Sequence, residues 1–77
     1  MAPELKKALV EYIMGRKSFT VVGHPQVLAV IYEAAKASRI LRETLASGDI
    51  EATTLAVENK RKAVERFERI TGKNWGI

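Results

Sequence analysis

Few residues of this chain have the types and spacing that chemistry requires. His24 is the only histidine and cysteine is absent, so a zinc site would depend on carboxylates almost alone, and no serine or threonine has an obvious basic partner. Glu65 and Glu68 share a predicted helix face, but arginines surround them. The i, i+4 pairs are Arg61–Glu65 and Glu65–Arg69, so we interpret the two carboxylates as structural charge. We therefore predict no enzyme activity, no catalytic residue, no metal site and no cofactor.

His24 stands beside Pro25 at a predicted helix start. A protonated imidazole there would oppose the positive end of the helix dipole. We interpret His24 as a turn or capping residue, with a ligand or general-base role as the alternative. Gly23 precedes it, but a phosphate cradle needs several glycines and a parallel sheet behind them, and the sequence indicates neither.

Positive charge is concentrated toward the C-terminal end of the sequence. Residues 60–73 carry six cations against Glu65 and Glu68, a surplus equal to the formal net charge of +4 for all 77 residues. The cations of this basic segment are Lys60, Arg61, Lys62, Arg66, Arg69 and Lys73. A basic stripe on one helix is typical of a protein that binds nucleic acid or an acidic partner. The alternative is a solvated helix face. It is favoured because two glutamates interleave the cations and no aromatic side chain is expected to stack among them.

The composition indicates a small globular protein. A length of 77 residues supports one hydrophobic core, so we predict a single small helical domain over residues 1–77. With 47% hydrophobic and 29% charged residues, wholesale disorder is excluded, and no apolar run is long enough for a membrane span. The first residues lack the pattern of a signal peptide, and the absence of cysteine fits a reducing compartment. We expect a cytoplasmic protein without a membrane partner.

Three stretches have the apolar spacing of α-helices, which predicts a mainly α fold with helices over about 3–14, 25–46 and 49–71. Pro3 and Pro25 suit first helical positions, Gly48 suits the left-handed end of the second helix, and Asp49 suits the N-cap of the third. The second helix is apolar over so wide an arc that two of its sides must be covered. The short turn after it predicts an antiparallel hairpin of the second and third helices.

One short β-strand is predicted over about 17–22, between the first two helices, because the segment is β-branched and aromatic with alternating faces. A lone strand needs a partner for its backbone groups, and its own copy across a two-fold axis would supply one. A strand followed by two helices in a small basic protein also raises the ribbon-helix-helix class of DNA-binding proteins. The chain departs from that class because a full helix precedes the strand and the second helix is long and unbroken.

Self-association is the interaction that the sequence favours most. A small core, a central helix that is apolar on two sides and a lone strand all indicate a homodimer or higher oligomer. The residues predicted at the oligomer interface are Phe19, Val21, Leu28, Ile31, Ala35 and Leu45. Trp75 is expected to fold back over the core, and the alternative is an anchor for a partner protein.

The function that follows is that of a non-enzymatic interaction or assembly module, acting as an adaptor or regulator of a larger complex. Its predicted partners are a second copy of itself and another protein. The alternative is a small dimeric DNA-binding transcriptional regulator that uses the basic helix face or the paired strand.

Overall fold

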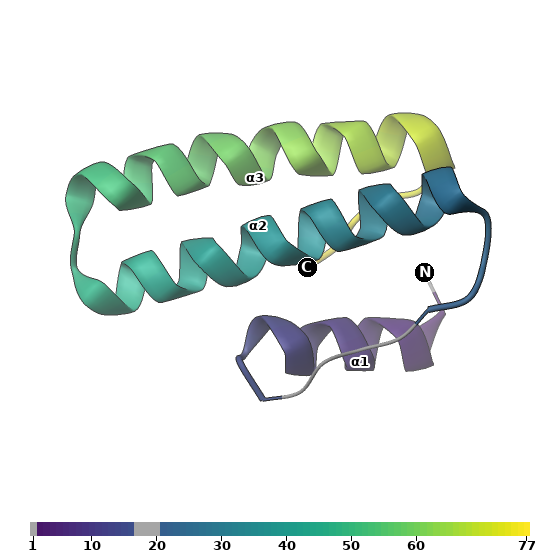
Figure 1. Ribbon diagram of the computed structural model, residues 1–77, viewed down its shortest axis with the longest axis horizontal. Coiled ribbons are helices and arrows are strands. Elements are labelled where there is room, and N and C mark those ends of the chain that lie inside the picture. Colours follow the sequence, from purple (N-terminus) through teal and green to yellow (C-terminus); the bar gives the residue numbers. More distant parts are fainter. Residues whose placement is uncertain (1, 17–20) are drawn as a thin grey trace.

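The computed structural model describes residues 2–16 and 21–77, and within these ranges the chain forms three helices (Figure 1). They are α1 (Pro3–Ile13), α2 (Pro25–Ser47) and α3 (Ile50–Thr71). The predicted helices are confirmed, with each end within one residue of its predicted position. A proline opens both α1 and α2, where its missing N–H would have no helical acceptor.

The turn between α2 and α3 follows the predicted local chemistry. Gly48 has φ 76°, in the left-handed region, and its N–H donates to the carbonyls of Thr44 and Leu45. Asp49 is the N-cap of α3, and its carboxylate accepts from the N–H of Ala52 at 3.0 Å. Because one residue ends a helix and the next begins another, the chain reverses and α2 and α3 pack against each other.

Figure 1 shows α2 and α3 side by side as an antiparallel hairpin, with α1 below them. Helix α1 contacts α2 and runs in the same direction as α2. The residues after α3 turn back and lie between the hairpin and α1. The hairpin is therefore covered on one face by α1 and by the C-terminal residues.

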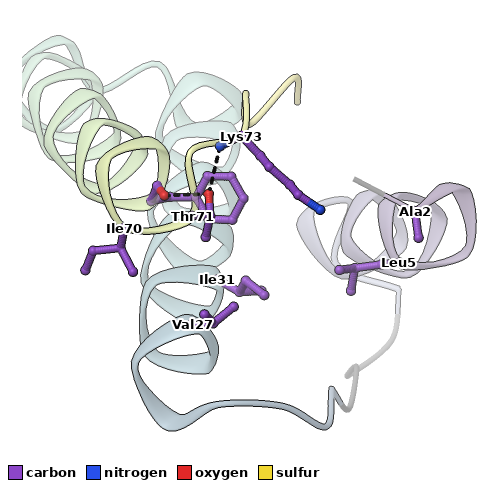
Figure 2. Close-up of a pocket in the computed structure, with 8 residues that line it drawn as sticks. Ala2, Leu5, Val27, Ile31, Ile70, Thr71 and Lys73 are labelled. Carbon is purple, nitrogen blue, oxygen red and sulfur yellow. Dashed lines mark hydrogen bonds between the residues drawn. The ribbon is translucent and has the colours of Figure 1, made fainter.

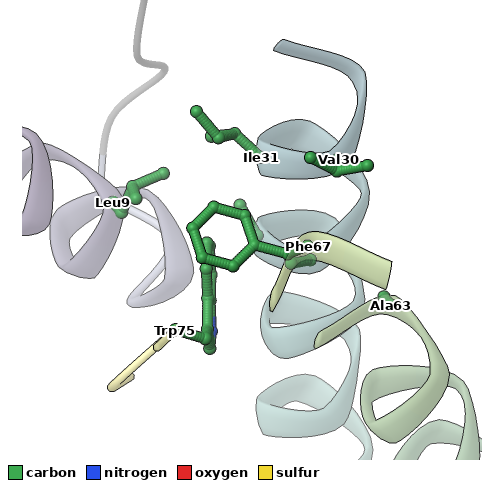
Figure 3. Close-up of a cluster of buried hydrophobic side chains, with 8 residues drawn as sticks. Leu9, Val30, Ile31, Ala63, Phe67 and Trp75 are labelled. Atoms are coloured by element: carbon green, nitrogen blue, oxygen red, sulfur yellow. The ribbon is translucent and has the colours of Figure 1, made fainter. Parts of the chain in front are cut away.

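The hydrophobic core lies where these three parts meet (Figure 3). The buried cluster consists of Leu9, Val30, Ile31, Ala34, Ala35, Ala63, Phe67 and Trp75. Ala34 and Ala35 are fully buried, and their small side chains leave room for Leu9 and the indole of Trp75 to approach α2. The rings of Phe67 and Trp75 pack edge to face with centroids 4.9 Å apart.

The predicted strand over 17–22 has no support. Residues 17–20 lie outside the described residues, and Val21 and Val22 belong to no strand or helix. Val21 packs against the core while Val22 is almost fully exposed, so these two positions serve as a connection between α1 and α2. None of the described helices is long and apolar enough to cross a membrane.

Candidate functional site

The difference in length between α1 and the hairpin defines the surface of most interest. Helix α2 has 23 residues and so extends about 35 Å, whereas the 11 residues of α1 extend about 17 Å. Near the end of α1, the ring of Tyr12 lies 4.9 Å from the guanidinium carbon of Arg39 on α2. Residues 40–57 extend beyond this contact, and we call them the open half of the hairpin (Figure 1).

The open half has apolar side chains but almost no core. Of its residues only Ala56 is buried, and Ala56 is not a member of the main buried cluster. Leu45 is 62% exposed and Ile50 is 81% exposed. These two side chains line a depression of about 230 Å³ together with Gly48, Thr53 and Thr54. A two-helix layer with an uncovered apolar face is the arrangement that a further layer of structure stabilises.

The five described residues of the predicted oligomer interface do not form one exposed surface. Ile31 and Ala35 are buried inside the chain, Val21 and Leu28 are half-buried, and Leu45 is exposed. Phe19 lies outside the described residues. The apolar arc of α2 that suggested an external partner is covered in its first half by α1 and Trp75 of the same chain. Of the five described positions, Leu45 is therefore the one whose side chain is mostly exposed.

Several cations of the basic segment are engaged within the chain. Arg61 pairs with Glu58 and Glu65, and Arg66 pairs with Glu33 of α2. This confirms the predicted Arg61–Glu65 pair. The hydrogen bond from Arg61 lowers the pKa of the Glu58 carboxyl, and the same contact raises the pKa of Arg61.

The other cations differ in their surroundings. The ammonium of Lys60 donates to the carbonyl of Ile77 at 3.0 Å. For Lys62, Arg69 and Lys73, the described part of the chain supplies no carboxylate within ion-pair distance. Among the described residues, Arg61 and Arg66 of the segment are therefore held in ion pairs, whereas Lys62, Arg69 and Lys73 have no carboxylate partner.

The carboxylates and the histidine that drew attention in the sequence have structural roles. Glu65 accepts from Arg61, and a carboxylate oxygen of Glu68 accepts from the backbone N–H of Trp75 at 3.0 Å. His24 is the N-cap of α2, where Nδ1 accepts from the N–H of Gln26 at 3.2 Å, as predicted for a capping residue. Across the described ranges no group of three histidine, aspartate or glutamate residues lies close enough together to hold a metal ion.

An apolar cavity of about 420 Å³ lies at the other end of the molecule from the open half (Figure 2). It is lined by Ala2 and Leu5 of the α1 end, Val27 and Ile31 of α2, and Phe67, Ile70, Thr71 and Lys73 from the end of α3 onward. The sequence contained no signal for this cavity, because its walls come from three separate segments. Trp75 is 3% exposed in the adjacent core, so it has folded back and its indole is not displayed to a partner.

No known protein family, curated protein or solved structure matches the chain significantly.

Proposed function

We propose that the protein is a non-enzymatic assembly module that self-associates through the open half of the α2–α3 hairpin. The observation that supports this proposal is the exposed apolar pair Leu45 and Ile50 around one depression, at the end of the hairpin that α1 does not reach. A second copy offers the same apolar surface, and a two-fold arrangement of two open halves would convert two helical layers into a four-helix packing.

The placement of charges in the open half suits one arrangement of two copies. The N-cap Asp49 and Glu51 of the first turn make the start of α3 acidic, while Arg42 is exposed on α2 and its neighbour Glu43 pairs with Arg39. When two hairpins meet about a two-fold axis that runs parallel to their helices, α2 of one copy lies against α3 of the other. Arg42 of each copy would then approach the acidic first turn of the partner's α3. This attraction favours the arrangement over one in which α2 of each copy lies against α2 of the other.

Sedimentation of the full chain over a micromolar concentration series tests the proposal. The mean mass of the wild type is expected to rise with concentration from 8.6 kDa toward a multiple of that value. Leu45→Gln and Ile50→Gln are each expected to weaken the dimer by about tenfold or more, because each substitution occurs twice in a two-fold interface.

Leu55→Gln is the matched control. Leu55 is 67% exposed, similar to Leu45, and lies on α3 five residues after Ile50, on a different face of the helix. This variant is expected to dimerise as the wild type does. A monomeric wild type, or equal effects of Ile50→Gln and Leu55→Gln, would contradict the proposal.

DNA binding by the basic segment, in a dimeric regulator, is the alternative. The engagement of Arg61, Arg66 and Lys60 within the chain favours the assembly proposal over it. If the alternative holds, duplex DNA retains the wild type near physiological salt, retention falls steeply as salt rises, and the triple variant in which Lys60, Arg61 and Lys62 become Glu is not retained. We expect no retention of the wild type.

A further inference from the structure

We propose that the cavity at the end of the molecule remote from the open half binds a small amphipathic carboxylate. In this arrangement the apolar part of the ligand lies among the side chains of three helices, and the carboxylate meets the ammonium of Lys73. The proposal concerns a different surface from the open half and does not depend on self-association.

The walls of the cavity fit an apolar tail. Leu5, Val27, Ile31, Phe67 and Ile70 present hydrocarbon surface from α1, α2 and α3. The volume is about 420 Å³. Ligand sites span roughly 300–1,000 Å³, so this cavity suits a ligand toward the small end of that range, such as a medium-length alkyl carboxylate.

Lys73 is held at the rim of this cavity by its neighbours. Its backbone N–H donates to the hydroxyl of Thr71 at 3.2 Å, and that hydroxyl donates to the carbonyl of Phe67 at 2.8 Å. Two residues further on, Trp75 is buried and bonded to Glu68. Figure 2 shows the Lys73 side chain extending from the end of α3 toward Ala2 at the start of α1. The ammonium therefore projects across the mouth of the cavity from an anchored backbone.

The charges around the mouth favour an anion. Among the described residues that line the cavity, Lys73 is the only charged one. Glu68, the carboxylate nearest to it along α3, accepts a hydrogen bond from Trp75, and within the described ranges no carboxylate forms an ion pair with Lys73. The start of α1 has no side-chain cap, so its first backbone N–H groups also lack a side-chain acceptor. A carboxylate accepts from these donors and also pairs with the charge of Lys73, whereas a neutral head group supplies no charge and a cationic one is repelled by the ammonium.

Three probes with the same alkyl chain separate the contributions of head group and tail. Decanoate, decanol and decyltrimethylammonium are titrated into the full chain below their aggregation concentrations, by calorimetry and by the emission of Trp75, the only tryptophan. Phe67 lines the cavity and packs on Trp75, so a bound tail is expected to change this emission. We expect one decanoate per chain, weaker binding of decanol, and weaker binding still of the cation.

Lys73→Gln tests the role of the ammonium, and Lys62→Gln is its matched control. Lys62 is an exposed cation of α3 that lines a separate groove with Glu33 and Arg66. Lys73→Gln is expected to weaken decanoate binding by roughly three- to tenfold and to leave decanol unchanged, whereas Lys62→Gln changes neither. Because Lys73 also follows the negative end of the α3 dipole, the melting temperature of each variant is measured beside its affinity.

Other outcomes overturn the proposal. Failure of decanoate to bind at millimolar concentration, equal binding of the three probes, or equal effects of the two lysine substitutions would each do so. Decanoate binding to Ile50→Gln is expected to equal that of the wild type, so a failure of this proposal and a failure of the assembly proposal are distinguishable.

Discussion

Trp75 is the residue whose substitution tests the architecture most directly. It lies outside the helices, yet its side chain is buried between α1 and the hairpin and packs on Phe67. Its indole Nε1 is buried and has no hydrogen-bond acceptor among the described residues. The indole therefore contributes apolar packing at one end of the ring and an unmatched donor at the other.

The magnitudes of these two contributions predict an ordering of variants. Trp75→Ala removes the ring and is expected to cost about 3–5 kcal/mol. A chain of this length has a total stability of about 4–12 kcal/mol, so the loss is a large fraction of the total and is expected to unfold the variant only if the wild type lies near the lower end of that range. Trp75→Phe keeps an aromatic ring against Phe67 and removes the donor, so we expect a cost of only about 0–1.5 kcal/mol.

Urea denaturation followed by far-ultraviolet circular dichroism measures both variants without relying on tryptophan emission. Glu68→Gln, which weakens the hydrogen bond to the Trp75 N–H, is expected to cost about 1 kcal/mol. Glu65→Gln, on the exposed side of α3, is its control. If Trp75→Phe is as costly as Trp75→Ala, the indole N–H is matched and the reasoning fails. If both cost less than about 1 kcal/mol, the tail does not pack on the core.

Three further predictions concern the turn and the surface of α3. Asp49→Ala is expected to lower the free energy of unfolding by about 1 kcal/mol through loss of the N-cap, and Asp49→Asn by much less, as chemical denaturation would show. Gly48→Ala is expected to cost about 1–2 kcal/mol, because φ is 76° although no atom lies within 4 Å of the added Cβ; a cost near zero would contradict it. Glu58 is expected to titrate below its ordinary pKa of 4.5, because Arg61 hydrogen-bonds the ionised form. Its stabilising contribution is then present above that pH and is lost as pH falls through the lowered pKa, and Arg61→Gln should return the pKa toward 4.5 in an NMR titration.

The helices and the turn could be predicted from the sequence because their causes are local. The missing N–H of Pro25 suits a helix start, the left-handed φ of Gly48 ends α2, and the carboxylate of Asp49 caps α3. Each of these effects operates within about one helical turn. The hairpin of α2 and α3 follows from the same turn. The capping role of His24 and the Arg61–Glu65 pair are predicted by spacing alone for the same reason.

The segment before α2 shows where local reasoning is weaker. A β-branched run favours a strand, but a strand also needs a neighbour for its backbone groups, and sequence preference does not supply one. Val21 packs on the core and Val22 is exposed, in a connection with no described ladder. The alternating pattern that suggested a strand therefore corresponds, at these two positions, to one side chain on the core and one in solvent.

Which apolar residues meet one another was decided by the tertiary structure alone. Ile31 and Leu45 both contribute to the apolar arc of α2, yet Ile31 is buried and Leu45 is exposed. The difference arises because α1 is about half as long as α2, and because Trp75 returns over the half that α1 covers. Helical periodicity determines the face on which a side chain lies, whereas its burial depends on what packs against that face. The cavity at Lys73 is built by segments that are distant in the sequence. The open half is continuous in the sequence, and it is left uncovered because α1 ends before it.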